Sequence, residues 1–176
     1  MTDAPHRPIP ESYWVEPGRF LAGEYPGLRY DEAQTRQRLT AFLNAGFDTF
    51  IDLTTENERQ PYFSMLSEEA EYEGREIRHR RFSFPDFHVP SHEMMVATLD
   101  ALDAALAEGR KVYLHCVGGI GRTGMTVGCY LVRRGKTGEQ ALRQLAEWWQ
   151  AVPKRAHFPR SPETDTQEQF IRDWKD

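Results

Sequence analysis

The segment HCVGGIGRT, residues 115–123, places a thiol, a guanidinium and a hydroxyl close together in the chain. Cys116 can act as a nucleophile, and the planar fork of Arg122 can hold two oxygens of a phosphate. The residues between them are uncharged and rich in glycine: Val117, Gly118, Gly119, Ile120 and Gly121. A nucleophile beside phosphate-binding groups predicts phosphoryl transfer from a substrate to Cys116.

A strand is predicted before this loop and a helix after it. Residues 111–114 are rich in β-branched and aromatic side chains, and residues 123–134 read as a helix. The first N–H groups of a helix lack partners, so a strand, a glycine-rich turn and a helix start form a cradle for an anion. The positive end of that helix also favours the thiolate form of Cys116, which is the nucleophilic form.

The composition predicts a single compact enzyme domain over residues 1–176, with residues 1–10 as a loose N-terminal tail. The net charge of −5 argues against nucleic acid as a partner, because binding a phosphate backbone needs a basic surface. No stretch is long and apolar enough for a membrane span, and no signal peptide is recognisable. With two cysteines and no disulfide pattern, we expect a cytoplasmic protein. We also expect a monomer.

Strand-like and helix-like segments alternate along the chain. This order predicts an α/β fold with a central, mostly parallel, twisted sheet of about four to five strands and helices on both faces. Ligands bind beyond the carboxyl ends of such strands, which is where Cys116 falls. Strands are expected at 12–16, 19–22, 48–53, 76–82 and 111–114, and helices at 31–45, 61–73, 91–108, 123–134, 137–149 and 164–174.

The pattern His-Cys-x5-Arg-Thr resembles the signature of the cysteine-based protein tyrosine phosphatase superfamily, and Gly124 also fits it. A buried structural cysteine in a glycine-rich turn is the alternative reading. The segment FPDFHVP, residues 84–90, looks like the general-acid loop of the small dual-specificity branch. The resemblance implies that Cys116 attacks phosphorus, that Arg122 holds the phosphate, and that Asp86 protonates the leaving group. It implies no metal and no cofactor.

Three further residues are candidates for supporting roles. The hydroxyl of Thr123 can donate a hydrogen bond to the Cys116 sulfur, or it can merely satisfy the helix start. His115 either orients the loop or is an ordinary core residue. Gln167 matches the family glutamine that positions the hydrolytic water, but it also completes a helix-capping pattern. The chain carries Glu163 where tyrosine-specific members have a further glutamine.

The substrate class stays open at this stage. A phosphorylated protein is favoured over inositol phosphates or phosphoinositides, because enzymes for the latter often carry lysines inside the loop. A non-catalytic phospho-binding module is a third possibility, although this chain keeps the cysteine, the arginine and the acid. Cys129 reads as a core residue, with a redox partnership as the alternative. The basic run 78–81 either lines the cleft mouth or forms a solvated strand edge.

Overall fold

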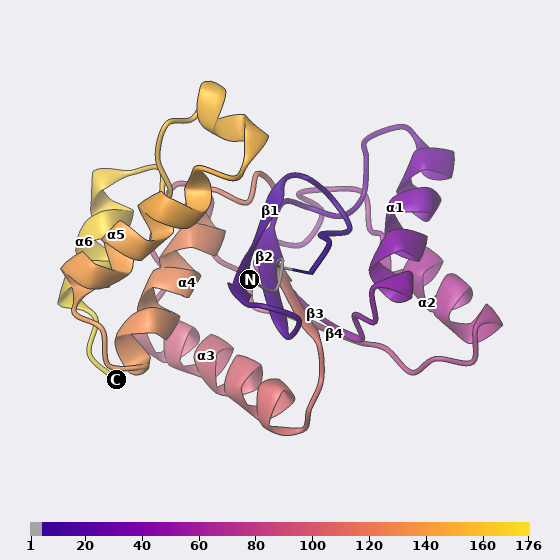
Figure 1. Ribbon diagram of the computed structural model, residues 1–176, viewed down its shortest axis with the longest axis horizontal. Coiled ribbons are helices and arrows are strands. Elements are labelled where there is room, and N and C mark those ends of the chain that lie inside the picture. Colours follow the sequence, from indigo (N-terminus) through magenta and orange to yellow (C-terminus); the bar gives the residue numbers. More distant parts are fainter. Residues whose placement is uncertain (1–4) are drawn as a thin grey trace.

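A five-stranded sheet forms the centre of the protein, with strand order β1-β2-β5-β3-β4 (Figure 1). The structure is a computed structural model and describes residues 5–176. The strands are β1 (Ser12–Glu16), β2 (Phe20–Gly23), β3 (Thr49–Asp52), β4 (Arg78–Arg81) and β5 (Val112–His115). The pair β1 and β2 is antiparallel, whereas β2, β5, β3 and β4 run parallel. The predicted mostly parallel sheet is confirmed.

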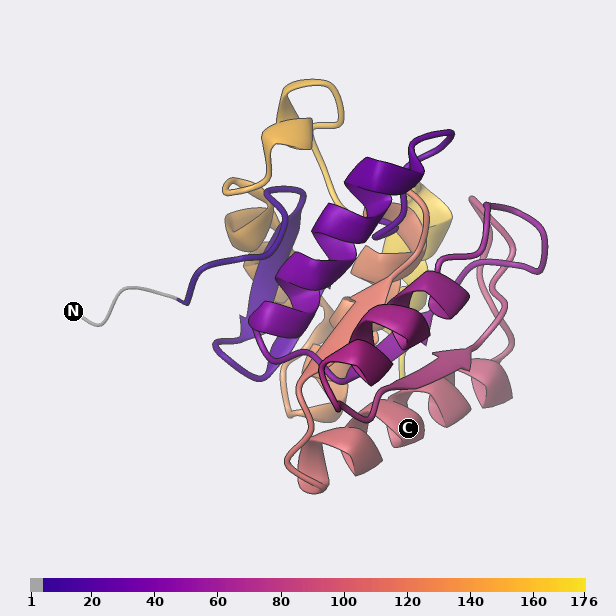
Figure 2. The ribbon, with the colours of Figure 1, turned by 90° about the vertical axis from the view of Figure 1, so that its right-hand side faces the viewer.

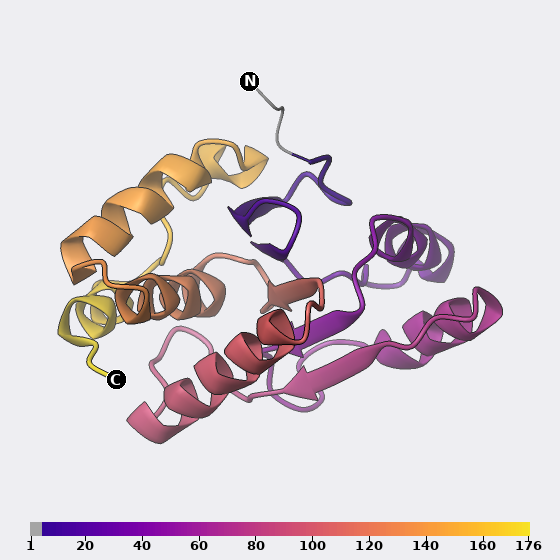
Figure 3. The same cartoon turned by 60° about the horizontal axis from the view of Figure 1, so that its bottom comes forward.

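Helices cover both faces of the sheet, as predicted (Figures 1 and 3). One face carries α1 (Glu32–Asn44) and α2 (Phe63–Tyr72), which lie side by side in Figure 2. On the other side lie α3 (His92–Ala107), α4 (Gly121–Arg133), α5 (Gly138–Trp149) and α6 (Asp165–Asp173). A short 3-10 helix, η1 (Pro153–Ala156), was not predicted from the sequence. Within residues 5–176, no helix has the length and apolarity needed to cross a membrane.

The alternation of side chains along β5 explains why both faces are covered. Val112 and Leu114 belong to the apolar core under α3 to α6, whereas Tyr113 belongs to the core under α1 and α2. Successive residues of a strand point to opposite faces of the sheet, so a strand that is apolar throughout must be covered on both faces. Each fully buried Val or Leu side chain contributes about 1.5–3 kcal/mol from apolar burial. This double burial holds β5 rigidly at the centre of the sheet.

Side-chain caps fix where several helices begin. Ser91 accepts a hydrogen bond from the Met94 N–H at the start of α3, and capping boxes open α5 at Thr137 and α6 at Thr164. The second predicted helix begins at Phe63 instead of Pro61. The reason is Tyr62, which is 1% exposed and bonds His115 through its hydroxyl, so the chain packs inward there before the helix starts.

Residues 5–10 of the expected loose N-terminal tail are attached to the domain at several points. Ile9 is 3% exposed, the Arg7 guanidinium donates to the Ser12 carbonyl, and Trp14 Nε1 donates to the Pro5 carbonyl at 2.7 Å. Three prolines and the lack of periodicity suggested a loose segment, but one apolar side chain and two main-chain carbonyls anchor it. Residues 1–4 of the expected tail lie outside the described part of the chain.

Candidate active site

The loop between β5 and α4 carries Cys116 at the carboxyl end of the central strand. Cys116 directly follows β5, which lies between β2 and β3, and the sulfur-bearing residue is 3% exposed. The helix after the loop begins at Gly121, two residues before the predicted start. The expected position of Cys116 beyond the strand ends is therefore confirmed, with Arg122 in the first turn of the following helix.

The carbonyl groups of the loop are held by the segments around it. The Cys116 carbonyl accepts a hydrogen bond from His115 Nδ1 at 3.0 Å, and the Val117 carbonyl accepts one from the Tyr25 N–H at 2.9 Å. The Gly118 carbonyl accepts one from Lys154 Nζ at 2.8 Å, and the Ile120 carbonyl accepts one from the Ser161 hydroxyl at 2.7 Å. Among residues 5–176, no protein acceptor bonds the backbone N–H groups of 117–120. The C=O and N–H of one peptide point in opposite directions, so fixing the carbonyls outward turns the N–H groups inward as a cup for an anion.

Two glycines of the loop are required by close packing. Gly119 has φ +73°, and a Cβ there would lie 2.5 Å from the backbone carbon of Gly23. A Cβ on Gly121 would lie 2.7 Å from Glu163 Oε1 and 2.9 Å from the amide group of Gln167. Glycine therefore allows the loop to lie directly against β2 on one side and against the segment that opens α6 on the other.

Arg122 is 1% exposed and is held by two carboxylates. Its Nη1 and Nη2 donate to the two Glu58 oxygens at 2.9 and 2.6 Å, and Nη2 lies 3.3 Å from Asp86 Oδ1. Nη1 also donates to the Phe84 carbonyl at 3.2 Å. Burial opposes the charge, but the Glu58 hydrogen bonds and nearby anions outweigh it and raise the pKa of Arg122. The buried Nε has no acceptor within residues 5–176, which leaves this donor for an oxyanion.

Asp86 comes to the same site from the loop after β4. Its side chain is 45% exposed, and its Oδ1 accepts a hydrogen bond from the Phe87 N–H at 3.0 Å. Phe87 has φ +61°, a left-handed conformation that makes a tight turn just after the acid. The 3.3 Å approach to Arg122 brings the predicted acid and the predicted phosphate-binding residue together.

Thr123 and His115 flank the sulfur. The Thr123 hydroxyl donates to Cys116 Sγ at 3.1 Å, which stabilises a thiolate more than a thiol. His115 Nδ1 must carry its proton, because it faces the Cys116 carbonyl at 3.0 Å, so Nε2 accepts from the Tyr62 hydroxyl at 2.7 Å. Burial lowers the pKa of His115 and keeps the ring neutral, although Asp52 opposes this.

Gln167 both caps α6 and lies against the phosphate loop. Its backbone N–H and side-chain oxygen complete the capping box with Thr164, and its side chain sits beside Gly121. Its Nε2 also donates to the His88 carbonyl at 3.4 Å, which ties it to the acid loop. Nearby, burial and then the charge of Asp86 raise the pKa of Glu163. Capping of α6 and a position beside the phosphate loop are thus compatible, because Gln167 does both.

Several charged or reactive residues outside the phosphate loop have structural roles. Asp52 is fully buried and contacts His79 Nε2 and Arg81 Nη2, each at 3.1 Å. The run 78–81 forms β4 at the edge of the sheet, as the solvated-edge reading predicted. Burial raises the pKa of the Cys129 thiol, and Cys129 is a core residue of α4. No group of three or more metal-ligating side chains occurs in residues 5–176.

Glu58 carries only a weak signal in the sequence, and four other residues that shape the loop carry none: Tyr25, Tyr62, Lys154 and Ser161. Glu58 follows the end of β3, the neighbour of β5, and this position is the one signal that pointed to it. The others act through a backbone N–H, a hydroxyl or an ammonium group that carries no motif. Only their place in space identifies them.

Comparisons with known proteins agree with this geometry. Residues 10–171 match a family model described as "Swiss Army Knife protein, DSP-PTPase phosphatase domain". A phosphatidylinositol 3,4,5-trisphosphate 3-phosphatase and protein-tyrosine-phosphatase, PTEN1 of Arabidopsis thaliana, is 32% identical over 101 residues, covering 56% of this chain and 23% of its own length. The tyrosine-protein phosphatase CDC14 of Candida albicans is 29% identical over 103 residues, covering 57% of this chain and 19% of its own.

Among solved structures, the active form of Tk-PTP superposes with a TM-score of 0.67 at 24% identity, covering 92% of this chain and 94% of its own. The chain spans about a fifth of the length of the two curated relatives, 23% and 19%. The family match covers nearly the whole chain, and the fold and the Cys116 loop agree with it. The chain therefore belongs to the cysteine-based protein tyrosine phosphatase superfamily, in its dual-specificity-like branch.

Proposed function

We propose that this protein is a cysteine-dependent phosphomonoester hydrolase that acts through a phosphocysteine intermediate. One observation carries the proposal: Cys116 lies at the base of a loop whose carbonyls are held outward, with the Thr123 hydroxyl 3.1 Å from its sulfur. The inward N–H groups and the free Nε of Arg122 suit the three peripheral oxygens of a phosphate. These fixed donors supply positive charge where the transition state develops negative charge.

In the first step, the Cys116 thiolate attacks phosphorus and a P–S bond forms as the P–O bond to the leaving group breaks. Asp86 gives its proton to the departing oxygen, for which its position at the mouth beside Arg122 is suited. Glu58 keeps the Arg122 guanidinium in the plane needed to hold phosphate oxygens. His115 supports the loop through the Cys116 carbonyl and is a positioning residue.

In the second step, water attacks the phosphorus of the intermediate. The Asp86 carboxylate accepts a proton from this water, the P–S bond breaks, and Cys116 leaves as a thiolate. The Thr123 hydrogen bond stabilises the departing sulfur anion. We assign the orientation of this water to Gln167, and its position beside Gly121 and its hydrogen bond to the acid loop support the assignment.

We infer that the substrates are phosphotyrosine proteins, with phosphoserine and phosphothreonine as further substrates. The uncharged residues 117–121 support a substrate recognised through one phosphate at the loop itself. The two cysteines are both free, which fits a reducing, cytoplasmic location. We also expect the protein to work as a monomer, and without a metal because Arg122 and the loop supply the charge.

The test is phosphate release from p-nitrophenyl phosphate and from phosphotyrosine, phosphoserine and phosphothreonine peptides, in buffer containing a chelator. Wild type is expected to turn over, whereas Cys116→Ser is inactive because an alcohol is not held as an anion at neutral pH. The Cys129→Ser variant is the matched control and should keep wild-type turnover if it folds with the same melting temperature. Turnover by Cys116→Ser, or none by wild type on any of these esters, would contradict the proposal.

A further inference from the structure

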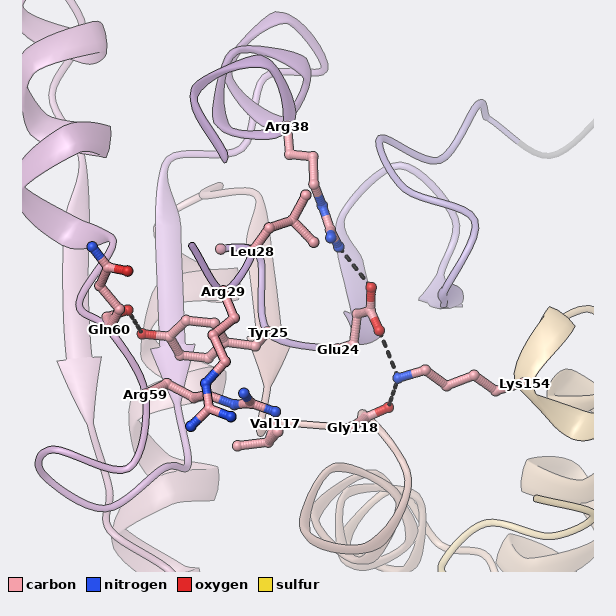
Figure 4. A pocket seen from close by; sticks show the side chains of 11 residues that line it. Glu24, Tyr25, Leu28, Arg29, Arg38, Arg59, Gln60, Val117, Gly118 and Lys154 are labelled. Carbon is pink, nitrogen blue, oxygen red and sulfur yellow. Dashed lines mark hydrogen bonds and ion pairs between the residues drawn. The ribbon is translucent and has the colours of Figure 1, made fainter. Parts of the chain in front are cut away.

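A cavity of about 270 Å³ lies beside the phosphate loop, between its Val117–Gly118 edge and the segment that follows β2 (Figure 4). We call it the side pocket. Its walls also include residues of α1, of the segment after β3 and of η1. Val117 and Gly118 directly follow Cys116 in the phosphate loop, so the side pocket shares this edge of the loop with the candidate active site.

The side pocket is basic although the protein carries a net charge of −5. Its charged lining residues are one carboxylate, Glu24, and four cations, namely Arg29, Arg38, Arg59 and Lys154. Both Glu24 oxygens are already paired, Oε1 with Arg38 Nη2 at 2.7 Å and Oε2 with Lys154 Nζ at 2.6 Å. The same Lys154 ammonium donates to the Gly118 carbonyl, so this ion-pair chain is part of the wall that supports the phosphate loop.

Arg29 and Arg59 are the cations that Glu24 leaves uncompensated. Within residues 5–176, neither guanidinium has a carboxylate at ion-pairing distance, and Arg29 is exposed while Arg59 is half-buried. In Figure 4 both side chains extend toward the Val117 edge of the side pocket. Like charges directed into one cavity repel each other, and an anion bound between them removes that repulsion. Guanidinium groups are suited to phosphate because their planar forks match its oxygens.

We propose that the side pocket binds a second phosphate group carried by the same substrate, next to the phosphate that Cys116 attacks. This inference rests on the proposed function and narrows its substrate class to molecules with two neighbouring phosphates. The uncharged phosphate loop had favoured singly phosphorylated protein substrates. The additional charge comes instead from Arg29 and Arg59, on two segments far from the loop in sequence. The second phosphate can belong to a neighbouring phosphorylated residue of a peptide or to another position of a small polyol phosphate.

The test compares kcat/KM for matched pairs of substrates in two arms. One arm uses a phosphotyrosine peptide and the same peptide with a second, adjacent phosphotyrosine; the other uses inositol monophosphate and an inositol bisphosphate with adjacent phosphates. Wild type should prefer the doubly phosphorylated member by about tenfold or more, the effect of one or two charge-assisted hydrogen bonds. The double variant Arg29→Ala/Arg59→Ala should bring that ratio close to one, mainly through a higher KM for the doubly phosphorylated substrate.

Arg143→Ala is the matched control, because Arg143 is an exposed arginine of α5 outside the side pocket. It should keep the wild-type ratio, and raising the salt concentration should lower the ratio in wild type. A preference in either arm that depends on the two arginines supports the inference. The arm that shows the preference tells whether the second phosphate belongs to a peptide or to a small polyol phosphate. No preference in both arms, or a ratio that survives the double variant, overturns it. Activity on monophosphates with no such preference would leave the proposed function standing, whereas inactivity on every ester would remove it.

Discussion

Glu58 accepts hydrogen bonds from both terminal nitrogens of Arg122, at 2.9 and 2.6 Å, although the two residues are far apart in the sequence. Glu58 is itself held, because its Oε2 also accepts from the Thr55 N–H at 2.8 Å and from the Thr55 hydroxyl at 3.0 Å. Burial disfavours its charge, but Arg122 and Thr55 more than compensate and lower the pKa of Glu58. The guanidinium is therefore fixed before substrate arrives, which leaves Nε as the free donor.

Glu58→Gln should lower kcat by roughly 10- to 100-fold, the effect of losing charge-assisted hydrogen bonds that orient Arg122. KM should change less, since the positive charge of Arg122 remains. Steady-state kinetics on a phosphotyrosine peptide measure both constants, and Glu56→Gln, an exposed neighbour in the same turn, is the matched control. A faster Glu58→Gln enzyme would show instead that Glu58 competes with the substrate for Arg122.

Asp86→Asn should lower kcat by roughly 10²–10⁴-fold for a phosphotyrosine or alkyl phosphate, whose leaving oxygen needs a proton. The loss should be much smaller for p-nitrophenyl phosphate, because its leaving group departs without protonation. The basic limb of the pH–rate profile should also flatten, since that limb reports the acid that must be protonated. Equal losses for all leaving groups would assign the proton to another residue, and His88→Asn would then be the next variant to measure.

Thr123→Ala should slow the hydrolysis of the phosphocysteine more than its formation, because the 3.1 Å hydrogen bond to sulfur stabilises the leaving thiolate in the second step. Rapid mixing with p-nitrophenyl phosphate should then show a burst of nitrophenol followed by a slow steady rate. Thr123→Ser keeps the hydroxyl and should restore the steady rate. A variant without a burst, or a Ser variant as slow as the Ala variant, would show that the hydroxyl has no role in this step.

The free energy of unfolding should fall as the pH drops below about 6.5 and fall further below about 4, which are the ordinary ranges of His and Asp. His115 is buried and its pKa is lowered, so the unfolded chain takes up this proton first. Burial would raise the pKa of Asp52, but His115, His79 and Thr54 hold it well below its usual range. Both groups therefore stabilise the fold at pH values above the pKa that they have in the unfolded chain. This contribution to the free energy of unfolding is lost in acid.

Denaturant unfolding between pH 3 and 8 measures this dependence. Asp52→Asn should be less stable at pH 7, because Arg81 and His79 lose a buried anion, and its stability should vary less below pH 4. Asp31→Asn changes an exposed helix cap and is a control for loss of a carboxylate that does not contact this cluster. Stability that is constant from pH 7 to 3 in wild type would contradict the prediction.

The sequence by itself determined the order of the elements and predicted the nucleophile and the phosphate loop. Cys116, Arg122 and Thr123 lie in one short segment, so their spacing alone identifies the chemistry, and the alternation of strands and helices identifies the sheet. Local caps at Ser91, Thr137 and Thr164 were likewise readable, because a cap and its partner are three residues apart.

Tertiary structure decided what surrounds that loop. Glu58 pairs with Arg122 because particular parallel strands become neighbours. The loop carbonyls are held by Lys154 and Ser161 because η1 and the segment after it lie beside the phosphate loop. In the sequence, Arg29 carries no signal, and Arg59 shows only that it follows a strand end. The two share a cavity because β2 and β3 flank β5. Such contacts join distant segments through single side chains that have no local pattern, so only the folded chain shows them.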